Sequence, residues 1–121
     1  MVNDVTSQSF YSLISIQELV NQGRLTVVNR RARNRLEDLG WDAETLKDFI
    51  LALNEGHFLA KYPQCSCGSF NIDCDGYKMQ FDENERIEDK RDGTELFIKL
   101  AISSNSTTTL IISFHLDGSP G

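Results

Sequence analysis

The residues best suited to chemistry lie near the carboxyl end of the chain. Residues 95–116 hold two runs of β-branched, aromatic and other apolar residues with a tract of serine, asparagine and threonine between them, which is typical of a β-hairpin. A register that places Lys99 opposite Ser113 also places Phe97 opposite His115. The sequence therefore predicts an ammonium, a hydroxyl, an aromatic ring and an imidazole on one face of this hairpin.

The other face of the hairpin is the candidate core surface. Side chains alternate between the two faces of a strand, so one face should carry Leu96, Ile98, Leu100 and Ile102, together with Leu110, Ile112, Phe114 and Leu116. Two interpretations of the polar face stay open. It is an ordinary solvated face, or it is a reactive site in which His115 gives and takes a proton near neutral pH.

A cluster of arginines forms a second candidate binding feature. Arg30, Arg31, Arg33 and Arg35 lie within six residues and, on a helix, spread around the side opposite the apolar residues. Two interpretations are again open. The arginines form an ordinary solvated helix face, or they form a binding surface for phosphates or for an acidic partner. Arginine suits phosphate because its planar guanidinium donates two parallel hydrogen bonds.

The cysteines give a weaker signal. Their odd number, together with the absence of a signal peptide, argues against a disulfide framework and favours free thiols. His57, Cys65, Cys67 and Cys74 could in principle be zinc ligands, but their spacing departs from the usual paired Cys-x-x-Cys arrangement. We expect neither a metal site nor a cofactor.

Helical signals fill the first half of the chain. Ser15 is a candidate N-cap for a short helix that ends at Gly23, and the residues that follow Gly23 read as a connector. A second helix is predicted from about residue 28 to 39. A third runs from 43 to about 53 with Asp42 as its N-cap, and one further helical turn, capped by Asn54, closes at Pro63.

The periodicity then changes to that of strands. Residues 69–74 and 77–81 are strand candidates, Asp75-Gly76 between them reads as a tight turn, and residues 82–92 read as a charged loop. Helices followed by an antiparallel sheet indicate the α+β class. We expect a flexible N-terminus over residues 1–11 and a single domain over residues 12–118.

Composition and charge limit the class of protein. The chain has 121 residues and a net charge of −6, which disfavours loose binding of a polyanion but leaves room for a local basic site. Half of the excess negative charge falls in residues 82–92. No apolar run is long enough for a membrane helix and no signal peptide is visible, so we expect a cytoplasmic protein with no membrane partner.

Several short patches resemble the MqsR family, toxins of bacterial type II toxin–antitoxin systems within the wider RelE-like group. The patches are residues 19–24, 38–42, 50–58, 96–100 and 111–115, and the likeness in their order and spacing spans roughly residues 12 to 117. The resemblance implies a RelE-like α+β domain with N-terminal helices packed on a curved sheet. It also implies an endoribonuclease that cleaves mRNA without a metal, and a cognate antitoxin as protein partner.

The resemblance also suggests site residues, with departures from the family pattern. Lys61 is nearest to the family's lysine at the helix–strand junction, and Gln80 to a glutamine on the next strand, with Tyr77 as a second candidate. Phe97 stands where the family has a tyrosine, and His115 where it has a lysine. The first departure removes a phenol, and the second replaces an ammonium with a titratable group.

These residues suggest a mechanism in which the ribose 2′-hydroxyl attacks its own phosphate. We expect His115 to transfer a proton, Lys61 and Lys99 to stabilise the phosphate, and Gln80 or Tyr77 to position it. RNA contacts are expected from Phe97, which could stack a base, and from Arg30, Arg31 and Arg33. The alternative is a non-catalytic binding module on the same scaffold, which the missing tyrosine and the acidic charge favour.

Overall fold

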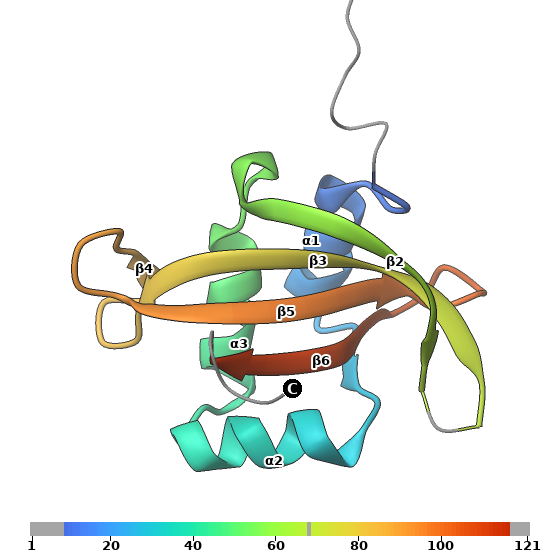
Figure 1. Cartoon of the computed structure of the whole chain (residues 1–121), viewed down its shortest axis with the longest axis horizontal. Coiled ribbons are helices and arrows are strands. Elements are labelled where there is room, and N and C mark those ends of the chain that lie inside the picture. Colours follow the sequence, from blue (N-terminus) through green and yellow to red (C-terminus); the bar gives the residue numbers. More distant parts are fainter. Residues whose placement is uncertain (1–8, 68, 117–121) are drawn as a thin grey trace, which may run out of the picture.

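The computed structural model describes residues 9–67 and 69–116 and confirms the α+β class (Figure 1). The expected domain boundary at residue 118 and most of the expected flexible N-terminus lie outside these residues. The elements are α1 (Leu13–Asn21), β1 (Leu25–Val27), α2 (Arg30–Leu39), α3 (Ala43–Ala52), a 3₁₀ turn η2 (Glu55–His57), β2 (Phe58–Ser66), β3 (Asn71–Asp82), β4 (Ile87–Glu88), β5 (Thr94–Ile102) and β6 (Thr109–Leu116).

Short polar side chains begin each helix. The side chain of Ser12 accepts a hydrogen bond from the Ser15 amide, so Ser12 and not Ser15 caps α1. Asn29 caps α2, which ends at Gly40 in the left-handed conformation with a φ of 73°. Asp42 caps α3 as predicted. The cap satisfies amide groups of the first turn that have no partner within the helix.

The strands form one mixed sheet in the order β1-β6-β5-β3-β2, with β4 paired to β3 outside this path. The segment predicted as a connector after Gly23 is β1, which lies parallel to β6, so the sheet is not wholly antiparallel. In Figure 1, α1 and α3 lie behind the sheet and α2 runs along the β6 edge. One face is therefore covered by α1 and α3; the other is called the open face below.

The largest correction concerns β2 and β3. Residues 58–66 form a strand that includes Pro63, where the sequence suggested a helical turn. Asp75-Gly76 is not a turn but lies inside the continuous strand β3. Asp75 is buried. Its burial is tolerated because its carboxylate accepts the amide hydrogens of Phe10 and Tyr11, each at 2.9 Å. Contacts far away in the sequence therefore override the local turn preference of this dipeptide.

A β-bulge changes which side chains of β6 reach the core. The pairing shifts between Lys99 and Leu100, so Leu100 lies opposite Ile111. Ile111 and Phe114 consequently pack in the main core, whereas Leu110 and Ile112 belong to a smaller cluster with Ala101 and Cys74. The predicted core row of β6 is thus wrong at Leu110 and Ile112, because a bulge adds one residue and interrupts the alternation. Phe114 is confirmed, and Leu116 lies opposite Leu96 on the same face but is 38% exposed at the end of the strand. The row predicted for β5 is confirmed.

The main core lies between the sheet and helices α1 and α3. Its centre is an aromatic cluster in which Trp41 contacts Phe49, Phe81 and Phe114 at centroid distances of 5.2–5.7 Å. The Trp41 indole N–H donates to Glu83 Oε2 at 3.0 Å. No helix within the described ranges combines the length and the hydropathy that crossing a bilayer requires.

Cys65 and Cys74 form a disulfide between β2 and β3, contrary to the expectation of free thiols. The register brings them together where the pairing of the two strands is irregular, between Tyr62 and Cys65. Cys67 is a free, buried thiol. Sequence spacing did not reveal the pair because nine residues separate the two cysteines and the shape of their loop depends on the strand register.

Candidate functional site

The open face brings together the polar residues of the C-terminal hairpin. The predicted register is confirmed, with Phe97 opposite His115 and Lys99 opposite Ser113. β3 extends both rows by one residue each. The first row across β3, β5 and β6 is Lys78, Phe97 and His115, and the second is Gly76, Lys99 and Ser113.

Lys99 extends across its row toward β2. Its Nζ lies 4.2 Å from the ring centroid of Tyr62 and 6.0 Å from that of Phe97. Gly76 makes this possible, since a Cβ on Gly76 would come within 2.5 Å of Tyr62 Cε2. No carboxylate in the described ranges forms an ion pair with Lys99. The ammonium lies against aromatic rings and can still bind an anion.

The hydrogen bond made by His115 selects the tautomer of its neutral ring. Its Nδ1 lies 3.0 Å from the carbonyl oxygen of Leu116, which can only accept, so a neutral imidazole carries its hydrogen on Nδ1. The ring rests against Phe97 at a centroid distance of 4.8 Å. His115 is half-buried, and in this tautomer its Nε2 carries the lone pair that a general base requires.

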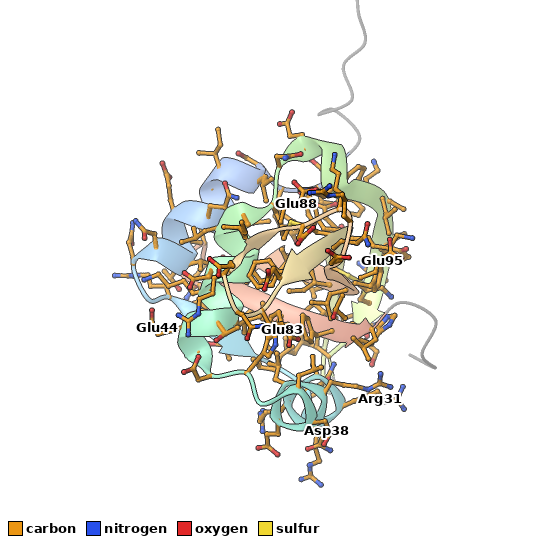
Figure 2. All side chains as sticks on the ribbon, turned by 90° about the vertical axis from the view of Figure 1, so that its left-hand side faces the viewer. Arg31, Asp38, Glu44, Glu83, Glu88 and Glu95 are labelled. Carbon is orange, nitrogen blue, oxygen red and sulfur yellow. A yellow bond between two sulfur atoms is a disulfide. The ribbon has the colours of Figure 1, made fainter. Side chains whose placement is uncertain are left out.

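Two hollows lie along the border between α2 and β6. The first, of about 400 Å³, is lined by Arg31, Lys99 and Ser113, together with Asn29, Ala32, Cys65, Ser66, Ile112 and Phe114. The second, of about 310 Å³, is lined by His115, Arg35 and Asp38, together with Leu39 and Leu116. Figure 2 shows Arg31 pointing from α2 toward the side of the molecule on which Glu95 of the open face lies.

Each hollow thus combines an α2 arginine with hairpin residues of the candidate site, Lys99 and Ser113 in the first and His115 in the second. Arg31 and Arg35 are four residues apart and so lie on the same side of the helix. Asp38 partly offsets the charge of Arg35 in the second hollow. The first hollow, with two cations and a hydroxyl, is therefore the better site for a phosphate group.

Two predicted site residues lie elsewhere. Lys61 pairs in register with Asp75 on the helix-covered face, and its Nζ lies 4.9 Å from the ring centroid of Phe10. Tyr77 is 2% exposed and packs in the main core. The expectation that Lys61 shares a site with Lys99 and His115 does not hold, because successive residues of a strand face opposite sides and Tyr62, not Lys61, is on the open face.

The other predicted residues lie at the margin. Gln80 is on the open face but pairs with Glu95, beyond the row of Phe97, and its Nε2 donates to the Gly93 carbonyl at 3.3 Å. Arg33 donates to the Val27 carbonyl at 3.1 Å. Arg30 and Arg33 are exposed and line neither of the two hollows. Arg31 is the member of the predicted trio that the structure brings to Lys99.

The structure adds Tyr62 and Lys78, which sequence reasoning missed, and Arg35, which belongs to the predicted arginine cluster but not to the predicted RNA contacts. Lys78 was missed because reading Asp75-Gly76 as a turn concealed its pairing with Phe97; its Nζ lies 4.0 Å from Glu95 Oε2. Arg35 could have been found from its spacing of four residues from Arg31. No local signal identified Tyr62, because its contact with Lys99 depends on the space that Gly76, which has no Cβ, leaves for the Tyr62 ring.

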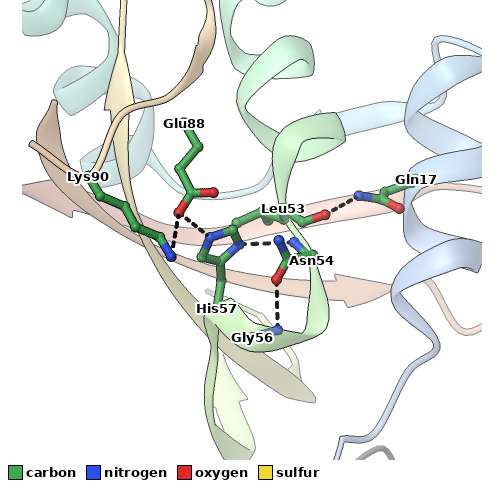
Figure 3. A network of polar contacts seen from close by, with 7 residues as sticks. All are labelled: Gln17, Leu53, Asn54, Gly56, His57, Glu88 and Lys90. Carbon is green, nitrogen blue, oxygen red and sulfur yellow. Dashed lines mark hydrogen bonds and ion pairs between the residues drawn. The ribbon is translucent and has the colours of Figure 1, made fainter.

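His57 has a structural role at the other end of β2 (Figure 3). Its Nδ1 accepts the Asn54 amide hydrogen at 2.9 Å, so its Nε2 carries the proton that is donated to Glu88 Oε2 at 2.9 Å. Lys90 Nζ lies 4.0 Å from the same carboxylate oxygen. Both ring nitrogens are occupied, and Cys65 is bonded to Cys74, so these residues do not form the zinc site considered above.

Comparison with known proteins does not assign the chain to a family. No family model matches the chain, and a search of curated proteins finds no significant match.

Proposed function

We propose that the protein is a metal-independent endoribonuclease that cleaves single-stranded RNA on the open face of its sheet. The observation that carries the proposal is the cross-strand pair of Phe97 and His115 beside Lys99. An imidazole that rests against an aromatic ring and an ammonium without a carboxylate partner among the described residues are the groups that proton transfer and phosphate binding need.

Each of His115, Lys99 and Arg31 has one role in the proposed reaction. The 2′-oxygen bonds to phosphorus, the bond from phosphorus to the 5′-oxygen breaks, and the products are a 2′,3′-cyclic phosphate and a 5′-hydroxyl. His115 Nε2 takes the 2′ proton and returns a proton to the leaving oxygen, directly or through water. Lys99 and Arg31, which line one hollow, stabilise the charge that develops on the phosphate oxygens.

The sequence resemblance to MqsR toxins supports the same reaction. It adds the proposals that the fold is RelE-like, that the substrate in the cell is mRNA and that an antitoxin protein neutralises the activity. Lys61 and Tyr77 have no part in the proposed reaction, because Lys61 lies across the sheet and Tyr77 lies in the core. Phe97 is 9% exposed, so it takes part by supporting the His115 ring and not by stacking a base.

The test is cleavage of an end-labelled single-stranded RNA in the presence of EDTA, with both product ends mapped. We expect a cyclic phosphate and a 5′-hydroxyl. Changing His115→Ala should slow cleavage by about 10²- to 10⁴-fold, the usual contribution of proton transfer, without changing the melting temperature. Unchanged cleavage by purified His115→Ala protein would remove this residue from the mechanism.

His57→Ala is the matched control. It also removes an imidazole, but one that binds Asn54 and Glu88 far from the hairpin site. It should lower stability and leave the rate of cleavage per folded molecule unchanged. Equal losses of activity in the two variants would show that the effect of His115→Ala is not specific to the site.

The second candidate is a binding module without catalysis. It is favoured by the position of Lys61, which lies on the helix-covered face and so removes one of the groups predicted for catalysis beside His115 and Lys99. Inducible expression in bacteria separates the two functions. Growth arrest with RNA breakdown, abolished by His115→Ala, supports the nuclease. Harmless overexpression together with saturable binding of intact RNA supports the module.

A further inference from the structure

A separate hollow lies on the helix-covered side of the sheet, away from the proposed nuclease site. Its volume is about 240 Å³, and its walls come from the segment that leads into α1, from η2, and from strands β2 and β3. The lining residues are Ser9, Phe10, Tyr11, Ser12, Leu13, Glu55, Phe58 and Tyr77. Its lining is more apolar than polar, with polar groups from Ser9, Ser12, Glu55 and the two tyrosines, a mixture that small-molecule sites usually show.

The hydroxyl of Tyr77 is the first sign of a ligand. The side chain is 2% exposed, and it forms no hydrogen bond within the described ranges. No fully enclosed side-chain oxygen or nitrogen in these ranges lacks a partner, so Tyr77 Oη must open onto the hollow that its side chain lines. Since this hydroxyl has no partner among the described residues and is not fully enclosed, it can donate to or accept from a molecule in the hollow.

The charge of the lining restricts what the hollow accepts. Among the described residues, Glu55 is the one charged residue of the lining, and neither lysine nor arginine belongs to it. Burial, followed by the negative charges of Asp75 and Glu55, raises the pKa of Tyr77, so the phenol remains neutral at physiological pH. A carboxylate beside a neutral hydroxyl favours a cation and disfavours an anion.

The apolar walls indicate the rest of the ligand. The rings of Phe58 and Tyr77 meet edge to face at a centroid distance of 5.6 Å, and Phe10 and Leu13 complete the apolar lining. A dry cavity of about 150 Å³ is enough for benzene, so 240 Å³ leaves room for a ring with a short side chain.

We propose that this hollow binds a small arylalkylamine, with its ring against Phe10 and Phe58 and its ammonium between the Glu55 carboxylate and Tyr77 Oη. The site is independent of the proposed nuclease function, because its lining shares no residue with the two hollows beside β6.

The test is a titration of the full-length protein with 2-phenylethylamine, followed by NMR chemical shifts. We expect saturable shifts at residues 9–13, 55, 58 and 77, with a dissociation constant of about 1 mM. The anionic analogue 3-phenylpropionate should bind at least about tenfold more weakly. An absence of saturation up to about 20 mM amine, or equal binding of the anion, would overturn the proposal.

Two variants separate the two polar contacts. Tyr77→Phe removes one oxygen and keeps the ring, and it should weaken amine binding by about tenfold. Glu55→Gln changes an exposed residue and should weaken binding by about 3- to 10-fold without affecting the fold. Full affinity in both variants would contradict the assignment. Since Glu55→Gln does not depend on core packing, the test remains decisive if Tyr77→Phe is unstable.

Discussion

Gly76 controls the open face because it has no side chain. The rings of Tyr62 and Phe97 occupy the space above it, and Lys99 rests on the Tyr62 ring. A glycine inside a strand often marks such a close approach. The position of the proposed phosphate-binding ammonium therefore depends on a residue that touches no substrate.

Changing Gly76→Ala tests this dependence. The added Cβ would meet Tyr62 Cε2 at 2.5 Å and Phe97 Cζ at 3.2 Å, so both rings must shift, and we expect the free energy of unfolding to fall by about 1 kcal/mol. Urea denaturation measures the loss. In a Tyr62→Ala background the same substitution should have a smaller effect, and strictly additive losses would contradict direct contact.

Asp75 gives a prediction of pH dependence. Burial raises the pKa of its carboxyl, and the hydrogen bonds from the Phe10 and Tyr11 amides oppose that shift only in part. A carboxyl whose pKa is raised by folding binds its proton more tightly in the folded state. Its stabilising contribution is therefore complete below the unfolded pKa of ~3.9 and is lost as the pH rises through the folded-state pKa.

The variant Asp75→Asn cannot titrate at this position, so it should lack this part of the pH dependence. We expect the stability of the parent relative to the variant to decline as the pH rises above about 4. Urea denaturation at several pH values provides the measurement. The variant also loses one of two amide contacts, which shifts its stability by a constant amount. A parent advantage that grows with pH would show that the sign is wrong.

At the scale of elements, Asn29 joins α2 to the sheet. Its Oδ1 accepts the Ala32 amide hydrogen at 2.8 Å as the helix cap, and its Nδ2 donates to the Ile112 carbonyl at the bulge of β6. The same side chain thus begins the helix that carries Arg31 and attaches it to the strand that carries Ser113. The first hollow lies between these two elements.

Two substitutions at Asn29 separate these roles. Asn29→Asp keeps the cap and loses the donor, whereas Asn29→Ala loses both. We expect the aspartate variant to lower the free energy of unfolding by about 1 kcal/mol and the alanine variant by about 2 kcal/mol, as measured by urea denaturation. An aspartate variant as stable as the parent would show that the contact with Ile112 contributes nothing.

At the scale of the whole molecule, a chain with a net charge of −6 is proposed to bind a polyanion. The cations of the first hollow, Arg31 and Lys99, are the local exception. Because so few cations are involved, affinity for RNA should depend weakly on salt. With two phosphates neutralised, the logarithm of the association constant should fall with the logarithm of salt concentration with a slope of about −1.4.

Binding of an RNA oligonucleotide to His115→Ala protein across a range of salt concentrations measures this slope without cleavage. Adding Arg31→Gln should make the slope less negative by about 0.7. Arg30→Gln is the matched control, since Arg30 is exposed on the same helix but does not line the hollow. Equal changes in the slope with both substitutions would indicate diffuse attraction and not a defined site.

The sequence determined the parts of this protein that depend on local patterns. The α+β class, the helix capped by Asp42, the hairpin and the pairs Phe97–His115 and Lys99–Ser113 could all be predicted. Alternation within a strand and capping at a helix start are decided by neighbouring residues. Strand alternation and helix capping could therefore be predicted from short stretches, without knowledge of the rest of the chain.

Only the tertiary structure decided what depends on contacts between distant segments. It made Asp75-Gly76 part of a strand, joined Cys65 to Cys74, placed the bulge that brings Ile111 into the core, and separated Lys61 from Lys99. The physical reason is common to all four. A register, a bulge or a face of a strand is selected by the total burial and hydrogen bonding across several strands, and no short stretch of sequence contains that sum.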